Sequence, residues 1–171
     1  MMITARSGHG KRGQMSEVIL RPMTADDYEA VQELWLSIRG FAIRSIDDSR
    51  EEILRFLKRN PGTSVVALEG ERIVGSILCG NDGRQGSFYH VCVAADRRRR
   101  GIGTRMAAFC MEALRKQKIN KISLIAFSPN DGGNAFWKQI GWTCRSDCNY
   151  YEFVLNKENI TRFISGDPAA Q

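Results

Sequence analysis

The chain of 171 residues lacks the sequence features that mark membrane, secreted and zinc-binding proteins. No apolar run approaches the roughly 20 residues needed to span a bilayer, and no apolar segment of a signal peptide is present. The five cysteines form no Cys-x-x-Cys pair, and neither histidine lies near the closest two, Cys144 and Cys148. These absences argue against a metal site or a disulfide scaffold, and they predict a soluble cytoplasmic protein without a membrane partner.

Length and composition indicate one globular domain. Hydrophobic residues make up 43% of the chain and charged residues 26%, which are ordinary values for a domain with a substantial core. The first residues, MMITARSGHGKRGQ, show no periodicity, and no internal repeat or interdomain linker follows. We therefore expect a flexible extension over residues 1–14, one domain over residues 15–157, and a C-terminal tail over residues 158–171 that ends in the frayed residues GDPAAQ.

Positive charge is the one compositional bias that bears on partners. The formal net charge is +6, and three of these charges lie in the N-terminal extension on Arg6, Lys11 and Arg12. Five further arginines fall within residues 97–105 beside a single acid, Asp96. Because the excess is concentrated at one short segment, it favours a local anion site, with a nucleic-acid surface as the alternative.

Apolar periodicity and turn signals predict an α/β domain with a mixed, mainly antiparallel sheet of six to seven strands and about four helices. Capping boxes at Thr24-x-x-Asp27 and Ser49-x-x-Glu52 predict two helix starts. The predicted strands are 18–21, 64–68, 73–79, 87–93 and 122–127; the later helices are 102–114 and 134–140; and the terminal hairpin is 142–144 with 150–155. The helix between strands 87–93 and 122–127 predicts that those two strands are parallel.

The segment from Val91 to Thr104 is the strongest functional pattern, because a strand, an arginine-rich glycine loop and a helix start follow one another. Gly101 and Gly103 place no Cβ between the backbone amides and an incoming phosphate, and the positive end of the helix points to the same place. Arg97 to Arg100 add guanidinium groups that match phosphate oxygens. Read alone, the same pattern is also typical of a solvated basic edge beside an ordinary turn. The P-loop and Gly-x-Gly-x-x-Gly phosphate motifs are absent.

A family resemblance favours the phosphate interpretation. Arg98-Arg99-Arg100-Gly101-Ile102-Gly103 fits the Arg/Gln-x-x-Gly-x-Gly/Ala signature of the GCN5-related N-acetyltransferase (GNAT) superfamily. The segment NDGGNAFWKQIGW, from Asn130 to Trp142, is similar to a second block of that family. The resemblance covers residues 17–153 and is specific for the superfamily, not for a substrate. It implies the GNAT fold, in which the central parallel strands splay apart and the cosubstrate acetyl-CoA enters between them.

The resemblance also implies roles for individual residues. Backbone groups of two strand residues bind the pantetheine arm, amides and arginines of the glycine loop hold the pyrophosphate, and segment 40–48 forms part of the acceptor wall. The residues placed around acetyl-CoA in this way are Val91, Cys92, Val93, Arg98, Arg99, Arg100, Gly101, Ile102, Gly103, Thr104, Asn130 and Trp137. The implied reaction is direct attack of a neutral amine on the thioester, without a covalent enzyme intermediate.

The catalytic residues are where this sequence departs from the family. Trp137 stands where many members carry the tyrosine that protonates the leaving thiolate, and an indole N–H donates a hydrogen bond but no proton. Positions that carry Glu or His in some members match Ser87 and Tyr89, so the base remains unassigned. Strand alternation predicts that His90 faces away from Tyr89 and is structural.

Tyr89 and Trp137 remain the catalytic candidates. Further candidates for substrate or proton-relay contacts are Asp82, Tyr150 and Tyr151. Cys92 is predicted to be a small buried side chain and not an acyl-carrying nucleophile, because no base stands at a helpful spacing.

Three function classes follow from these observations. The first is an acetyl-CoA-dependent N-acetyltransferase acting on a small-molecule or protein amine. The second is an acyl-CoA-binding module without catalysis, which Trp137 makes worth testing, and the third is a nucleic-acid binder that uses the arginine run. The sequence leaves the acceptor and a possible homodimer open.

Overall fold

The computed structural model describes residues 17–164, so the predicted extension 1–14 and the predicted frayed residues GDPAAQ lie outside the described part. In chain order, the elements are β1 (Val18–Pro22), η1 (Ala25–Asp27), α1 (Tyr28–Leu36), β2 (Ala42–Arg44), α2 (Arg50–Arg59), β3 (Val65–Glu69), β4 (Arg72–Asn81), β5 (Gly86–Val93), η2 (Ala95–Arg97), α3 (Ile102–Lys116), β6 (Ile122–Leu124), α4 (Asp131–Gln139) and β7 (Thr161–Phe163).

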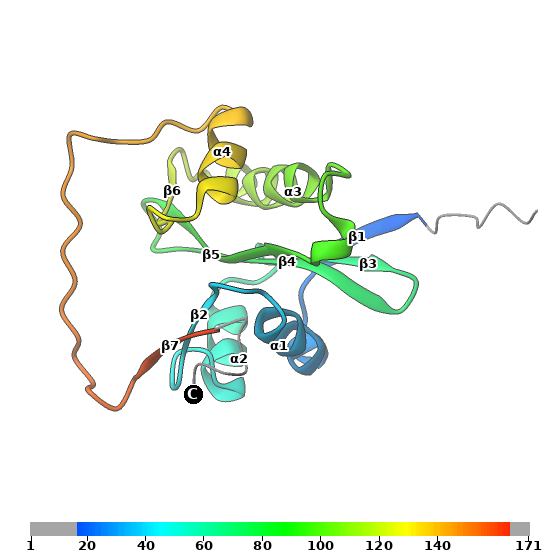
Figure 1. Cartoon of the computed structure of the whole chain (residues 1–171), viewed down its shortest axis with the longest axis horizontal. Helices are drawn as coiled ribbons and strands as arrows, with labels where there is room; N and C mark the ends of the chain where they lie inside the picture. Colours follow the sequence, from blue (N-terminus) through cyan, green and yellow to red (C-terminus); the bar gives the residue numbers. More distant parts are fainter. Residues whose placement is uncertain (1–16, 165–171) are drawn as a thin grey trace, which may run out of the picture.

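The domain is a sheet between two layers of helices (Figure 1). Five strands lie in the order β1-β3-β4-β5-β6, with α1 and α2 on one face and α3 and α4 on the other. The pairs from β1 to β5 are antiparallel, and β5 pairs with β6 in parallel. This arrangement confirms the predicted mixed, mainly antiparallel sheet and the parallel pair joined by α3. A small second sheet pairs β2 with β7.

The core lies on both faces of β4, whose residues from Ile73 to Gly80 are all buried. Trp35 of α1 fills one face and donates its indole N–H to Ser76 Oγ at 3.0 Å, so the buried hydroxyl is satisfied. Met106 of α3 fills the other face. Such burial accounts for the continuous apolar pattern of the central strands. Within residues 17–164, none of the helices is long and apolar enough to cross a membrane.

The predicted helix starts are confirmed. Thr24 and Asp27 form a reciprocal capping box at η1, which leads directly into α1. The Ser49 hydroxyl accepts the backbone N–H of Glu52 at the start of α2. Each cap satisfies donors that the first helical turn leaves without a partner.

The C-terminal part differs from the prediction. Residues 142–144 and 150–155 form no strand, so the predicted terminal hairpin is wrong, and residues 143–158 are all exposed. β6 ends at Leu124, three residues before the predicted end, and β7 lies within the predicted tail, beyond residue 157. Strand propensity depends on pairing and packing context, and residues 142–144 and 150–155 pair with no strand of residues 17–164.

The partner of β7 is segment 40–48, which the sequence predicts as irregular. Besides the three paired positions of β2 and β7, Gly40 and Phe41 exchange backbone hydrogen bonds with Ile164 at 2.9 and 2.8 Å. The Asn159 side-chain oxygen accepts the backbone N–H groups of Ile46 and Asp47. The C-terminal residues therefore hold segment 40–48 in place, which no local pattern in either segment predicts.

Candidate functional site

The parallel strands β5 and β6 separate along their length. Their pairing covers only Gly86 to Phe88 of β5, opposite Ile122 to Leu124 of β6. From Tyr89 to Val93, β5 is paired on the β4 side alone. The backbone edge of this half of β5 is therefore open to another extended group, which is how a strand edge binds a peptide-like ligand.

Two valines direct their backbone groups to this open edge. Ala94 donates its N–H to Val74 of β4 at 2.8 Å, so by alternation Val93 and Val91 direct theirs to the opposite side. The Arg98 guanidinium reaches the Val93 carbonyl from that side, at 3.1 Å. The carbonyl of Val93 is thus accessible to a donor.

The open edge leads into the glycine loop. Gly101 has φ of +72° and is the residue that precedes α3, and Arg99 also has a positive φ of +59°. Left-handed residues at alternate positions turn successive backbone N–H groups to one side and form an anion-binding concavity. No side chain caps α3, so the N–H groups of its first turn keep their hydrogen-bonding capacity. This geometry fits a phosphate group.

The arginines of the loop divide into two sets. Arg97 bonds to Glu69 at 2.6 Å and Asp96 at 2.7 Å, and Arg100 lies 3.9 Å from Glu69. Arg98 and Arg99 form no salt bridge within residues 17–164, and both side chains are exposed. The first set anchors the loop to β3, and the second set remains available to an anion.

Helix α4 closes the far side of the loop. A Cβ atom on Gly103 would lie 3.2 Å from the Phe136 ring, so a glycine allows α3 and α4 to approach closely. Trp137 is part of an aromatic cluster, with ring centroids 4.8 Å from Trp142 and 6.1 Å from Phe88 of β5. Asn130 caps α4, and its side-chain oxygen accepts the N–H of Gly133. Trp137 and Asn130 therefore both have packing or capping roles beside the loop.

The structure corrects the prediction that His90 faces away from Tyr89. Tyr89 packs edge to face on Phe56 of α2, and His90 lies 4.5 Å from the Trp35 ring of α1, so both are on the α1 and α2 face. His90 has φ of +47°, and the β4–β5 register shifts between Ser76 and Leu78. This β-bulge adds a residue to β5, and the alternation reverses there.

His90 forms a buried pair with Asp48. Its Nε2 lies 2.5 Å from Asp48 Oδ1, and Asp48 Oδ2 accepts the backbone N–H of Arg44 at 2.6 Å. Because the carboxylate only accepts, Nε2 carries the proton, and Nδ1 holds the free lone pair. Among residues 17–164, no side-chain nitrogen or oxygen is fully buried without a partner, and Nδ1 makes no hydrogen bond with them, so Nδ1 is not completely enclosed.

Sequence reasoning missed this pair because its members lie on different elements, 42 residues apart. The rings of Trp35 and Phe41 lie 4.5 and 5.0 Å from the imidazole and 6.4 Å from each other, so the three rings pack as one cluster. A histidine within the open half of β5, oriented by a carboxylate, has the arrangement of a general base. The only feature of the sequence that could have pointed to His90 is its position directly before Val91, the first residue assigned to acetyl-CoA.

Of the other polar candidates, Asp82 lies in the β4–β5 turn, whereas Tyr150 contacts Glu152, which lies 3.8 Å from Arg44 of segment 40–48. The Asp82 carboxylate accepts the backbone N–H groups of Gln85 and Arg84 in the β4–β5 turn, and these bonds lower its pKa. This contact gives Asp82 a structural role. Tyr150 donates to Glu152 at 2.9 Å, which raises its pKa, and Tyr151 is exposed. Tyr89, in contrast, lies directly beside His90.

The cysteines yield a first prediction. Cys79, Cys92 and Cys110 are buried, and Cys144 and Cys148 are exposed. Burial raises the pKa of Cys92 to about 11, in agreement with its predicted role as a small buried side chain. Because only accessible thiolates react, we expect two thiols to react rapidly with a disulfide reagent at about pH 8. The remaining three should react only in denaturant. Rapid reaction of a third thiol in the folded protein would contradict the burial of Cys92.

Comparisons with known proteins agree with this geometry. Residues 28–142 match the Acetyltransferase (GNAT) family. An acetyltransferase of Pectobacterium atrosepticum is 35% identical over 112 residues, which are 66% of this chain and 78% of that protein. An acetyltransferase of Sodalis glossinidius is 31% identical over 121 residues, which are 71% of this chain and 84% of the relative.

Solved structures share the fold. The PaiA N-acetyltransferase of Thermoplasma acidophilum, solved with coenzyme A, has a TM-score of 0.67 at 15% identity and covers 75% of this chain and 91% of its own. An aminoglycoside acetyltransferase from an uncultured soil metagenomic sample has a TM-score of 0.64 at 16% identity, with 81% and 97% covered. These likenesses show a shared fold. The chain belongs to the GNAT acetyltransferase family.

Proposed function

We propose that this protein transfers the acetyl group of acetyl-CoA to a primary amine by direct attack. The observation that carries the proposal is the open edge of β5 from Tyr89 to Val93, which continues into the uncapped glycine loop. A ligand that has two amides in an extended arm and a pyrophosphate at its end matches that order of features. Acetyl-CoA has this form, and it supplies an activated thioester.

In this proposal, different residues bind different parts of acetyl-CoA. Val91 and Val93 pair with the pantetheine amides, and Cys92 between them stays buried. The loop that contains Arg98, Arg99, Arg100, Gly101, Ile102, Gly103 and Thr104 binds the pyrophosphate. Asn130 and Trp137 support the thioester end through α4, where the Trp137 ring packs on Phe88.

We assign the role of proton acceptor to His90. Its free Nδ1 removes a proton from the substrate ammonium group, because an amine attacks a thioester only when it is neutral. Asp48 accepts the Nε2 proton and thereby fixes the tautomer and the orientation of the ring. As His90 becomes charged, the buried carboxylate stabilises it. To Tyr89, on the same face, we assign a contact with the acceptor.

Binding and turnover with the unmodified protein test this proposal separately. A ligand that binds only the folded state raises its stability, so we expect millimolar acetyl-CoA to raise Tm by several degrees. Incubation with a panel of primary amines should then release free CoA with at least one of them. The panel should contain polyamines, aminoglycosides and peptide N-termini, because members of the fold differ in acceptor.

Each outcome of these two measurements has one meaning. Stabilisation without CoA release from any amine would indicate an acyl-CoA-binding module. No stabilisation by acetyl-CoA, together with binding of nucleic acid that weakens with salt, would assign the arginine run to nucleic acid. Either result would overturn the proposed transferase.

A further inference from the structure

A single carboxylate binds both ends of the part of the glycine loop that carries the exposed arginines Arg98 and Arg99. Glu69 Oε2 accepts the Nε–H of Arg97 at 2.6 Å, and Glu69 Oε1 lies 3.9 Å from Arg100 Nη1. Only Arg98 and Arg99 stand between those two partners in the chain. The two oxygens of one side chain therefore bridge the segment that we expect to bind the pyrophosphate of acetyl-CoA.

The backbone of that segment has a conformation that needs support. Arg99 has φ of +59°, in the left-handed region that residues with a Cβ rarely adopt, and Gly101 follows with φ of +72°. A residue other than glycine keeps such a conformation only where the surrounding structure fixes it. Because Arg97 and Arg100 flank Arg99, contacts to their side chains restrict the backbone between them. The anion-binding concavity of the loop depends on this conformation.

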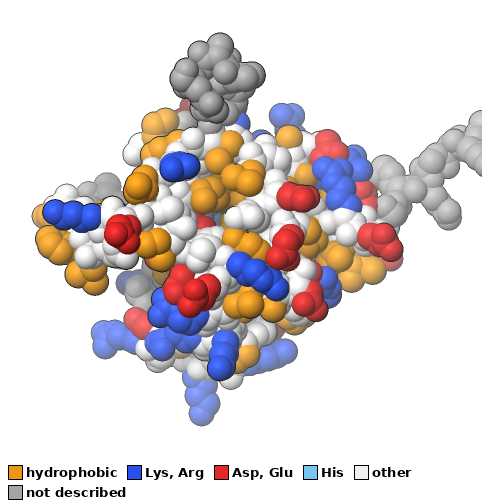
Figure 2. Space-filling model, turned by 90° about the horizontal axis from the view of Figure 1, so that it is seen from below, with side chains coloured by type: hydrophobic (Ala, Val, Ile, Leu, Met, Phe, Trp, Pro, Cys, Tyr) orange, Lys and Arg blue, Asp and Glu red, His pale blue; other side chains and the backbone are white. Residues whose placement is uncertain are grey.

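Two further ionic residues extend the contact across the β3–β4 turn. Asp96 accepts hydrogen bonds from Arg97 at 2.7 Å and from Arg72 of β4 at 2.9 Å. Figure 2 shows acidic and basic side chains side by side at the right of the molecule, the end at which Figure 1 places the β3–β4 turn. The side chains of Arg72 and Asp96 are 53% and 52% exposed, whereas that of Glu69 is 10% exposed. Because exposed ion pairs contribute little to stability, the loop depends most on Glu69.

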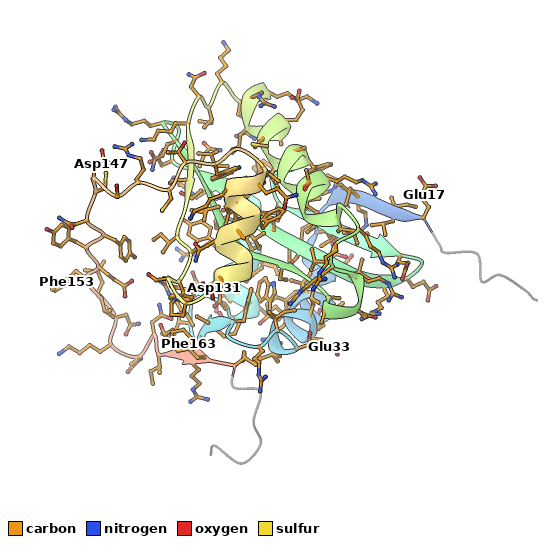
Figure 3. The ribbon with its side chains drawn as sticks, turned by 45° about the horizontal axis from the view of Figure 1, so that its top comes forward. Glu17, Glu33, Asp131, Asp147, Phe153 and Phe163 are labelled. Carbon is orange, nitrogen blue, oxygen red and sulfur yellow. The ribbon has the colours of Figure 1, made fainter. Side chains whose placement is uncertain are left out.

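Glu69 can fix the loop because the sheet fixes Glu69. It is the last residue of β3, and it is paired with Val18 of β1 on one side and with Arg72 of β4 on the other. Glu17, labelled in Figure 3, directly precedes Val18 and marks this end of the sheet. A side chain that extends from paired strands is a more precise support than one from a loop.

The charge of Glu69 opposes the binding of an anion. A carboxylate near a phosphate site repels the phosphate, and it offsets part of the attraction that Arg97 and Arg100 would exert. By charge alone, removal of Glu69 would therefore strengthen the binding of acetyl-CoA. A role in fixing the loop predicts the opposite result, so the sign of the change distinguishes the two effects.

We propose that Glu69 is a positioning residue for the acetyl donor: it holds Arg97 and Arg100 so that the N–H groups of the glycine loop converge on the pyrophosphate. The role assigned to Glu69 rests on the proposed function, because both concern the same loop. Glu69 does not contact acetyl-CoA and acts through the loop alone. Its support outweighs its repulsion because a pre-formed site needs no ordering when the ligand binds.

Glu69→Ala and Glu71→Ala form a matched pair of variants. Each removes one acid at the β3–β4 turn, but Glu71 is exposed and forms no salt bridge within residues 17–164. In Glu69→Ala, we expect KM for acetyl-CoA to rise about tenfold while kcat stays within about twofold. Both constants should be nearly unchanged in Glu71→Ala. Calorimetric titration with CoA gives the same comparison as Kd, without an amine.

A second substitution and a truncated donor exclude a general loss of structure. Glu69→Gln keeps the volume of the side chain and one weaker acceptor, so its KM should lie between those of Glu69→Ala and the unmodified protein. It also provides the test if Glu69→Ala melts below the assay temperature. S-acetylpantetheine lacks the pyrophosphate, so its kcat/KM should be the same with the unmodified protein and with either variant at Glu69.

The outcomes separate the role of Glu69 from the proposed function. If the unmodified protein neither binds nor uses acetyl-CoA, the proposed function fails, and the role of Glu69 fails with it. If the unmodified protein uses acetyl-CoA, an unchanged or lower KM in both variants at Glu69 would overturn the positioning role alone. An equal loss with S-acetylpantetheine would also overturn it, because the effect would not depend on the pyrophosphate.

Discussion

Gly101→Asp is expected to abolish acetyl-CoA binding, whereas Gly101→Asn is expected to retain most of it. Gly101 has φ of +72°, and both Asn and Asp tolerate this conformation better than other residues. A Cβ at this position meets no atom within 4 Å, so neither side chain clashes. The two variants therefore share the same strain and shape and differ in charge.

The effect of that charge is large because the carboxylate would stand where the pyrophosphate is expected to bind. We expect Kd for acetyl-CoA to rise about 100-fold or more in Gly101→Asp, equivalent to about 2.8 kcal/mol. In Gly101→Asn, we expect a change of less than about tenfold. Calorimetric titration of both variants, after their melting curves are matched, measures the difference. Equal affinities would place the phosphate site elsewhere.

His90→Asn is expected to reduce kcat about 10²- to 10³-fold while KM for acetyl-CoA stays nearly constant, because a general base contributes to the chemical step. Asparagine fits the left-handed backbone at this position, so the β-bulge is retained. The amide can still bond to Asp48, but it takes no proton from an amine. Steady-state kinetics with one accepted amine, in saturating acetyl-CoA, give the two constants separately.

Asp48→Asn is the companion variant. The amide oxygen can still accept the N–H of Arg44, but an amide N–H directed at His90 reverses the imidazole tautomer and places the proton on Nδ1. We expect kcat to fall by a similar factor and the double variant to be no slower than His90→Asn. Additive losses in the double variant would show that the two residues act independently. Full activity in His90→Asn would show that water, and not His90, accepts the proton of the substrate ammonium group.

Much of the architecture was predictable because it depends on local patterns. The caps at Thr24 and Ser49, the antiparallel strands β3 to β5, and the glycine loop all follow from residues close together in sequence. The parallel pairing of β5 and β6 followed from the helix between them. The open edge at Val91 and Val93 was predicted on another basis, the family resemblance.

The features that escaped prediction depend on contacts between distant segments. The side on which His90 lies depends on a bulge against β4, and its partner Asp48 belongs to a segment without periodicity. β2 and β7 have three residues each, too few to display an alternating pattern, and they are strands only because they pair with each other. Residues 150–155 have the composition of a strand, but composition does not identify a partner.

The β2–β7 pairing has a consequence for how acceptor choice can evolve. The family match ends at residue 142, while the residues that hold segment 40–48 come after it, from Glu158 to Ile164. Asp48 is part of that segment, so the orientation of His90, our proposed proton acceptor, depends on the C-terminal residues. The residues that we propose to bind acetyl-CoA all lie before residue 142. Under the proposed function, changes in the last part of the chain can therefore alter the surroundings of His90 without disturbing the residues assigned to acetyl-CoA.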